Sequence, residues 1–188
     1  MKTNKQFLPD MEQALTLAPV PENQHATASA SADAVRAAPI YAEVAVTIRR
    51  PRHDVAAVMF NPRYDAAWIG AVRKTQRAAP GPLRNGARVA REWRWLGYRG
   101  VETCEVVEHV PDRCMEMTTR LPFGLRIRYE LEGIPEGAIA RVRIHGQAAG
   151  LLRVMAMALN PLLRSTVIHD LDRLKALLES GVWRSLAA

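Results

Sequence analysis

The sequence lacks the patterns that mark metal sites and nucleophilic active sites. Its 188 residues include only two cysteines, with no CxxC pair, no HExxH string and no Cys/His cluster, so common metal-ligand spacings are missing. None of the five histidines is expected beside a serine, a cysteine or a carboxylate pair, as acid–base or nucleophilic catalysis requires. We therefore expect no metal and no cofactor, and the sequence names no catalytic residue.

A disulfide is also not expected. If 110–113 is the turn of a hairpin, pairing across it places Cys104 opposite Thr119 and Cys114 opposite His109. An offset of about five residues along a strand is roughly 16 Å, far beyond the reach of a disulfide. The two cysteines are thus expected to be reduced thiols, which favours a cytoplasmic location.

Long hydrophobic runs are missing as well. No stretch reaches the ~18 to 20 apolar residues that a membrane-spanning helix needs, and no unbroken apolar segment follows the N-terminal lysines as in a secretory signal. We expect no transmembrane segment, although a peripheral membrane or protein partner remains open.

The net charge is +7, and its distribution argues against nucleic acid as the partner. Residues 1–39 carry three basic and four acidic side chains, so they contribute −1 and the rest of the chain +8. Basicity of this size favours anionic partners. The arginines, however, are spread over the predicted strands, with no basic run interleaved with aromatic residues.

Residues 1–38 differ in composition from the rest. They are rich in Ala, Ser, Thr, Pro and Gln and show no sustained hydrophobic periodicity, which predicts a disordered N-terminal tail. The remaining residues, 39–188, are enough for one domain with a sizeable core.

Alternating apolar residues from Ile40 to Ile48 predict a half-buried first strand. Two short helices are expected next, one led by Pro51 and the other from Tyr64 to Ile69. Six strands follow, separated by Gly- and Pro-containing turns, at about 71–79, 87–96, 99–109, 113–121, 125–133 and 138–147. Consecutive strands joined by short turns predict an antiparallel meander.

The stretch 151–179 predicts one long amphipathic helix, with a kink near Asn160 because Pro161 removes a backbone donor. Ser180-Gly181 supplies its end. In the strand after Gly124, apolar residues alternate with charged residues, which predicts one face covered by the long helix and one charged face in water.

This order of elements resembles the START-like, or SRPBCC, superfamily, particularly its polyketide cyclase/dehydrase and lipid-transport branch. The residues that carry the resemblance, over about 40–181, are VTIRRPRHDVAAVMFNPRYDAAWIGAV, Gly86 in NGARV and the closing HDLDRLKALLE. The resemblance implies an α+β helix-grip fold, in which a curved antiparallel sheet of about seven strands wraps the C-terminal helix around a hydrophobic cavity. Members bind lipids, quinones, hormones, polyketides or aromatic molecules, and some are enzymes, but they share no universal catalytic motif.

Arg91 is the one charged residue expected on an inward face. It shares its strand phase with Val89, Trp93 and Trp95, and a buried guanidinium needs an anionic or carbonyl partner. Glu105 on the next strand is one available partner, and a ligand carboxylate is another. We favour an internal ion pair, or solvent access at the sheet end, over ligand recognition.

Methionine and aromatic side chains at inner positions suggest an adaptable cavity lining, with a solid core as the alternative. Together with inward aliphatic residues, the candidate ligand-binding residues are Met59, Trp68, Val89, Arg91, Trp93, Trp95, Met115, Met117, Ile127, Tyr129, Val142, Met155, Leu159 and Leu163. The predicted function is binding of a hydrophobic small molecule or lipid. The alternatives are a cyclase/dehydratase-like enzyme using the same cavity and an interaction module acting on a ribosome or membrane complex.

Overall fold

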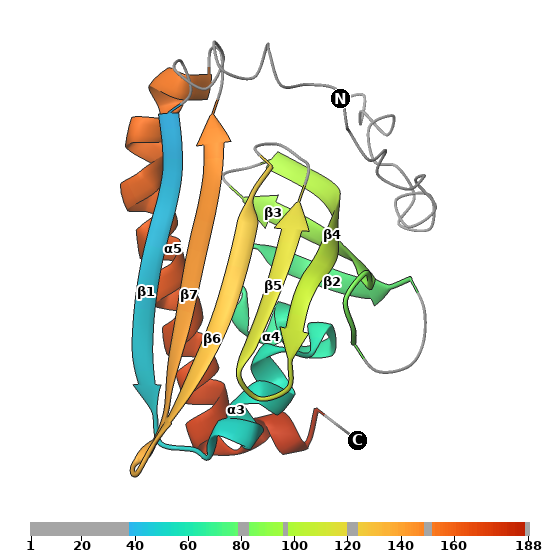
Figure 1. Cartoon of the computed structure of the whole chain (residues 1–188), viewed down its shortest axis with the longest axis vertical. Helices are drawn as coiled ribbons and strands as arrows, with labels where there is room; N and C mark the ends of the chain where they lie inside the picture. Colours follow the sequence, from blue (N-terminus) through green and yellow to red (C-terminus); the bar gives the residue numbers. More distant parts are fainter. Residues whose placement is uncertain (1–37, 79–82, 96–97, 120–123, 149–151, 187–188) are drawn as a thin grey trace, which may run out of the picture.

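The computed structural model describes residues 38–78, 83–95, 98–119, 124–148 and 152–186. At Trp95, Tyr98, Ala148 and 152–159 it describes the backbone alone. One antiparallel sheet curves around one side of a long C-terminal helix, and short helices close the lower end of the space between them (Figure 1). The expected tail, 1–37, lies outside the described residues.

The sheet confirms the predicted meander. Its seven strands are β1 (Ala38–Ile48), β2 (Val72–Arg77), β3 (Arg88–Trp95), β4 (Tyr98–Val110), β5 (Cys114–Thr119), β6 (Arg126–Ile134) and β7 (Gly137–Ala148). Their spatial order is β1-β7-β6-β5-β4-β3-β2. Six strands therefore pair with their sequence neighbours, and β1 closes the edge beside β7.

The helices lie where the sequence places them. α3 (Arg52–Met59) follows β1, and the second predicted helix consists of a 3-10 turn, η1 (Pro62–Tyr64), and a single turn, α4 (Asp65–Trp68). The long helix α5 (Leu152–Ser180) runs on through Pro161. Gly181 then adopts the left-handed conformation, with φ of 76°, before the 3-10 turn η2 (Val182–Arg184), as expected just beyond a helix end.

The core lies between α5 and the concave face of the sheet. Val167, Leu171, Leu174 and Leu178 form a buried stripe on α5, and each such side chain contributes about 1.5–3 kcal/mol when removed from water. The predicted alternation of β1 and β6 is confirmed, since the residues predicted to face inward, such as Ile40 and Ile48 on β1 and Ile127 and Tyr129 on β6, are buried or half-buried. This is the helix-grip arrangement.

The β4–β5 hairpin confirms one predicted pairing and corrects another. Cys104 lies opposite Thr119, as predicted, but Cys114 lies opposite Val110 rather than His109. A bulge between Val106 and Glu108 shifts the register by one residue, as an extra residue in one strand does. Both cysteines are free thiols.

Candidate ligand-binding cavity

A cavity of about 220 Å³ separates the concave face of the sheet from the middle of α5. Its walls are mostly apolar and come from β1, β2, β3, β4, β6, β7, α4, the segment after α4, and α5. The alternation of β6 brings Ile127 and Tyr129 to it, and that of β7 brings Val142 and Ile144. The apolar face predicted from the sequence is therefore not completely filled.

Half of the predicted binding residues line this cavity: Trp68, Arg91, Trp93, Ile127, Tyr129, Val142 and Leu163. Four others, Met59, Val89, Met115 and Met117, are buried in the solid core and are not among its lining residues. The side chains of Trp95, Met155 and Leu159 lie outside the described residues. These four residues are buried, as expected for inward-facing positions, but they do not line the cavity.

Aromatic side chains shape two of its walls. Trp68 meets Tyr129 edge to face, with ring centroids 6.0 Å apart. Trp93 lies against Gly100 on the neighbouring strand, where an added Cβ atom would stand 3.0 Å from the indole. Gly100 thus leaves the room in which the Trp93 ring packs onto the sheet.

Arg91 forms a buried ion pair with Asp65. Its Nε donates to Asp65 Oδ2 at 2.8 Å, and the two side chains are 5% and 1% exposed. Thr75 Oγ1 lies 3.4 Å from the same carboxylate oxygen. The predicted internal ion pair is therefore present, but its predicted partner is wrong: Glu105 lies opposite Arg88 and shares that residue's phase.

The pair is held in a desolvated setting. Burial raises the pKa of the Asp65 carboxyl, while the charge and hydrogen bond of Arg91 act in the opposite direction. Burial likewise works against the charge on Arg91, but the charge and hydrogen bond of Asp65, together with nearby Tyr129 and Cys104, outweigh it and raise the pKa of the guanidinium. Arg91 accordingly stays charged, with Asp65 as its counter-ion.

Glu102 is a cavity residue that the sequence reasoning missed. It lies directly opposite Arg91 in the β3–β4 ladder and lines the cavity. Desolvation raises the pKa of its carboxyl, and a hydrogen bond with Thr119 partly offsets this. The sequence could have identified it. Pairing residues outward from the turn predicted around Gly97 places Glu102 opposite Arg91.

Three buried polar atoms of cavity-lining residues have no hydrogen-bond partner in the described part of the chain. They are Arg91 Nη2, Trp68 Nε1 and Glu102 Oε1. Buried polar groups are nearly always paired, and each unpaired one costs about 1–3 kcal/mol. The two donors and one acceptor are thus unused hydrogen-bonding groups of residues that line the cavity.

One hydrogen bond joins the cavity wall after α4 to α5. The backbone N–H of Gly70 donates to Asp170 Oδ1 at 2.8 Å. Asp170 is itself buried, and desolvation raises the pKa of its carboxyl. Because Ile69, Ala71 and Asp170 all line the cavity, this contact holds two of its walls together.

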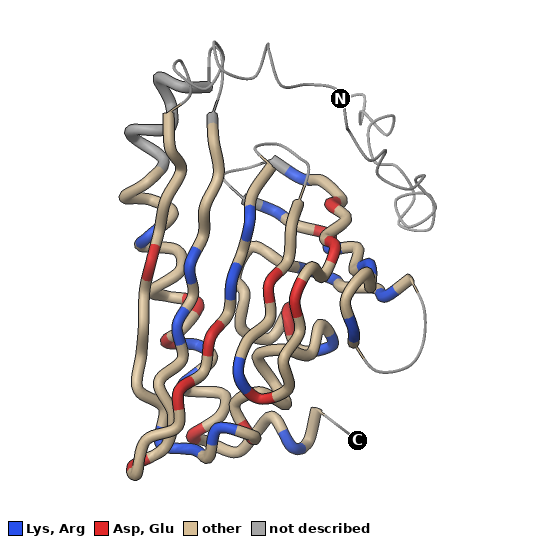
Figure 2. Tube along the Cα trace, in the orientation of Figure 1, with Lys and Arg blue, Asp and Glu red and all other residues tan. Residues whose placement is uncertain are grey.

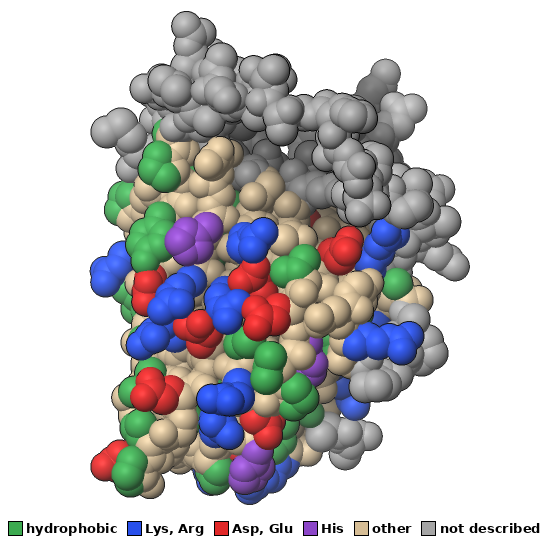
Figure 3. Space-filling view, in the orientation of Figure 1, with side chains coloured by type: hydrophobic (Ala, Val, Ile, Leu, Met, Phe, Trp, Pro, Cys, Tyr) green, Lys and Arg blue, Asp and Glu red, His purple; other side chains and the backbone are tan. Residues whose placement is uncertain are grey.

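The opposite, convex face of the sheet is covered with charges (Figure 2, Figure 3). Four arginines there, Arg126, Arg128, Arg141 and Arg143, pair with four glutamates, Glu43, Glu108, Glu116 and Glu130. We call these eight residues the outer charge network. His145 is exposed on the same face and His169 is exposed on α5.

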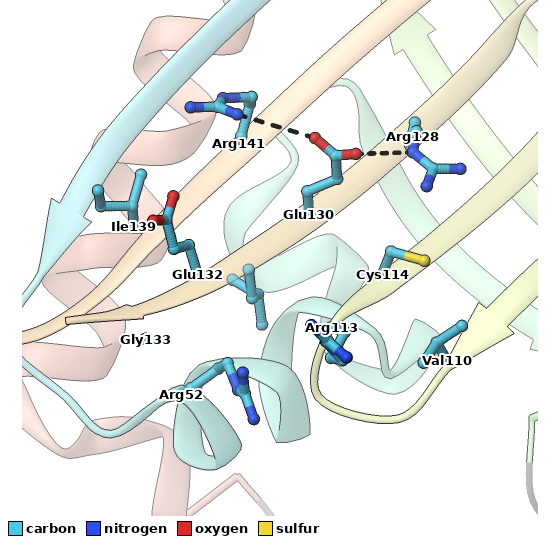
Figure 4. A pocket seen from close by; sticks show the side chains of 11 residues that line it. Arg52, Val110, Arg113, Cys114, Arg128, Glu130, Glu132, Gly133, Ile139 and Arg141 are labelled. Atoms are coloured by element: carbon cyan, nitrogen blue, oxygen red, sulfur yellow. Dashed lines mark hydrogen bonds and ion pairs between the residues drawn. The ribbon is translucent and has the colours of Figure 1, made fainter.

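A second hollow, of about 530 Å³, opens on this convex side near the ends of β6 and β7. Figure 4 shows that charged side chains surround it, including Arg52, Arg113 and Glu132, with Glu130 between Arg128 and Arg141. Its lining includes none of the three unpartnered atoms. The inner cavity is therefore the better candidate for a ligand.

The described residues contain no group of three or more His, Cys, Asp or Glu side chains placed to hold a metal ion. None of the helices that the structure describes is long and apolar enough to cross a membrane.

Solved structures with similar folds include two aromatase/cyclases. The aromatase/cyclase ZhuI from Streptomyces sp. R1128 aligns with 77% of this chain and 96% of its own, at 15% identity and a TM-score of 0.63. The di-domain aromatase/cyclase StfQ from the steffimycin biosynthetic pathway aligns with 77% of this chain over 52% of its own, at 13% identity and a TM-score of 0.63. At these identities the likeness establishes the fold alone.

SA2116 from Staphylococcus aureus, a protein of unknown function, aligns with 79% of this chain and 99% of its own, at 10% identity and a TM-score of 0.65. No curated protein matches the chain. The sequence model of the polyketide cyclase/dehydrase and lipid transport family matches residues 39–179, which span both the sheet and the long helix that enclose the cavity. The chain therefore belongs to the polyketide cyclase/dehydrase and lipid transport family.

Proposed function

We propose that the protein binds an apolar small molecule in the cavity between the sheet and α5. The observation that carries the proposal is the combination of apolar walls with the unpartnered donors of Arg91 and Trp68. Specific small-molecule sites have this composition, in which apolar walls provide affinity and a few polar groups orient the ligand. The driving force is removal of the ligand's apolar surface from water.

The volume limits the size of the ligand. A cavity of about 150 Å³ accommodates benzene, whereas drug-sized ligands occupy roughly 300–1,000 Å³. At about 220 Å³, this cavity suits a molecule of one or two rings, or a short section of a longer chain. A whole lipid would extend out of it.

Thermal shift against a panel of one- and two-ring compounds tests the proposal, because a ligand that binds only the folded state raises the melting temperature. Native mass spectrometry of protein purified from its host then identifies a copurified ligand. We expect at least one binder in the micromolar range. The proposal fails if no compound of a broad apolar panel shifts the melting temperature.

A cavity-filling variant shows where the ligand binds. Val142 is buried and lines the cavity, so Val142→Phe places a ring inside it and should weaken binding about tenfold or more. Val107→Phe is the matched control, because Val107 is 39% exposed on β4 and is not a lining residue. Circular dichroism confirms that both variants fold. Equal affinity of the two variants would place the ligand elsewhere.

Glu102 favours a second candidate function, a cyclase- or dehydratase-like enzyme. Desolvation raises the pKa of this cavity carboxyl, and a carboxyl that keeps its proton closer to neutral pH is suited to general-acid catalysis. In a dehydration it would give its proton to a departing hydroxyl, which leaves as water, and the resulting carboxylate would take a proton from the neighbouring carbon, so that the C=C bond forms and Glu102 regains its proton. Arg91 Nη2 would donate a hydrogen bond to a carbonyl oxygen of the substrate.

Glu102→Gln separates the two candidates. The amide retains the shape of the side chain but cannot give up a proton as an acid. An enzyme should lose about 10²-fold or more in turnover while it still binds the substrate. A binding protein has no turnover to lose, and its affinity should change little.

A further inference from the structure

We infer that Asp65 makes the cavity select uncharged hydroxyl-bearing ligands over the corresponding carboxylates. The inference rests on the proposed function and specifies its ligand class. An arginine in an apolar cavity suggests recognition of an acidic ligand, yet Arg91 already has a counter-ion in Asp65.

The charge of Arg91 is neutralised within the protein. Asp65 Oδ2 lies 2.8 Å from Arg91 Nε, and both side chains are at least nine-tenths buried. An incoming carboxylate would lose its hydration and would meet a guanidinium whose field Asp65 already cancels. The usual reason for an arginine to bind a fatty or aromatic acid is therefore missing.

The other ionisable groups around the cavity are acids. Among the described lining residues, Arg91 is the one basic side chain, whereas Glu102 from β4 and Asp170 from α5 are both carboxyls. Tyr129 from β6 is the remaining ionisable lining residue, and burial raises the pKa of its phenol to about 12. Arg173 lies near Asp170 and partly offsets its charge. The cavity therefore offers an incoming anion no positive charge that a protein carboxyl does not already oppose.

The unpartnered atoms still require hydrogen bonds from a ligand. Arg91 Nη2 is a donor and Glu102 Oε1 is an acceptor, and the two residues are direct cross-strand neighbours on the cavity side, with Cβ atoms about 4.5–5.5 Å apart. A phenol or alcohol oxygen can accept from the guanidinium while its own proton goes to the carboxylate. A carboxylate has no proton for Glu102, and an ammonium group has no lone pair for Arg91.

Trp68 adds a second donor. Its Nε1 is buried without a partner in the described part of the chain, and its side chain is 2% exposed. A ligand with a carbonyl or a second hydroxyl oxygen satisfies this indole N–H as well. The preferred ligand is accordingly a small ring system with one or two neutral oxygen groups.

Three probes that share one ring system test the inference: 2-naphthol, which is uncharged at neutral pH, 2-naphthoate, which is an anion, and naphthalene. Titration calorimetry on the full chain should show 2-naphthol binding about tenfold or more tightly than 2-naphthoate. Naphthalene should fall below 2-naphthol, because it satisfies none of the polar atoms.

The outcomes separate this inference from the function on which it rests. If none of the three probes binds, the proposed cavity function is the part that fails. If 2-naphthoate equals or exceeds 2-naphthol, the cavity binds ligands but Asp65 does not exclude anions, and the inference is overturned. This comparison needs no variant, so it does not depend on whether a substitution at Asp65 folds.

Asp65→Asn then tests the role of the residue directly. The amide oxygen can still accept from Arg91 Nε, but the guanidinium keeps an uncompensated positive charge. The preference should shift by about tenfold or more toward 2-naphthoate. Asp54→Asn is the matched control, because Asp54 on α3 pairs with Arg184 at 3.7 Å and is not a lining residue. An unchanged preference in a folded Asp65→Asn variant contradicts the inference.

Discussion

The two faces of the sheet use the same kinds of charged residue in opposite surroundings. On the concave face a single pair, Arg91–Asp65, is almost completely removed from water. On the convex face the outer charge network joins four arginines to four glutamates whose side chains mostly remain partly exposed. Both sets neutralise themselves, yet only the concave set leaves buried polar atoms without a partner.

This difference shows what a charge contributes on each face. In water, an ion pair gains little, because solvent already stabilises its partners and salt screens them. In the core, each partner depends on the other, since an isolated buried charge is very costly. We therefore locate ligand specificity on the concave face. The convex face is a solvated surface, on which the arginines of the outer charge network are paired with glutamates.

The largest effect is expected from breaking the inner pair. Arg91→Met retains most of the apolar stem but leaves Asp65 buried without its partner, and should lower the free energy of unfolding by about 3–5 kcal/mol. Urea denaturation measures the loss. The double variant with Asp65→Leu should recover much of it, because no charge is then stranded. A loss below about 1 kcal/mol for Arg91→Met would show that the pair is effectively solvated.

The pH dependence of stability should have opposite signs on the two faces. Folding raises the pKa of Glu102 by desolvation, so its ionisation costs stability as pH rises from the unfolded pKa, about 4.3, through the folded pKa. Folding lowers the pKa of Glu108, through its hydrogen bond with Arg128, so its contribution is present above the unfolded pKa and is lost as pH falls through the folded one.

Glu102→Gln and Glu108→Gln make this contrast measurable. As pH rises, the melting temperature of Glu102→Gln should increase relative to that of the parent protein, and the melting temperature of Glu108→Gln should decrease relative to it. Thermal melts from about pH 3 to 9 span both transitions. If the two differences had the same sign, the assignment of the faces to desolvated and solvated electrostatics would be wrong.

A smaller effect is expected in the outer charge network. Arg143 pairs with Glu43 and Glu130 through partly exposed side chains, so Arg143→Ala should cost less than about 1 kcal/mol. The difference should shrink further in high salt, because mobile ions screen exposed pairs. Denaturation at two salt concentrations tests both statements, and a loss of several kcal/mol would mean that the network is part of the folding core.

Removal of residues 1–37 should have the smallest effect. The predicted domain, with the sheet and its covering helix, begins where β1 begins, at Ala38, and the removed segment has neither apolar density nor periodicity. We expect the same melting temperature for the shortened and full-length proteins. A drop of many degrees would show that the segment packs on the domain.

Local patterns were enough to predict the sheet and its faces. The alternation in β6 gave the correct apolar and charged sides, and the turn at 110–113 gave the Cys104–Thr119 pairing. Such patterns succeed because strand period and turn chemistry are properties of short segments. The Cys114 pairing was wrong by one residue because the bulge in β4 has no comparable sequence signal.

The candidate site divides along the same line. The sequence by itself determined that Arg91 faces inward, because its orientation follows from its apolar strand neighbours. It did not identify Glu102, which the strand register of the structure places opposite Arg91. The partner Asp65 depends on how the single turn α4 packs against β2 and α5, and the cavity depends on how far α5 stands from the sheet. Only the tertiary structure decided these, because side-chain packing between distant segments sets both distances.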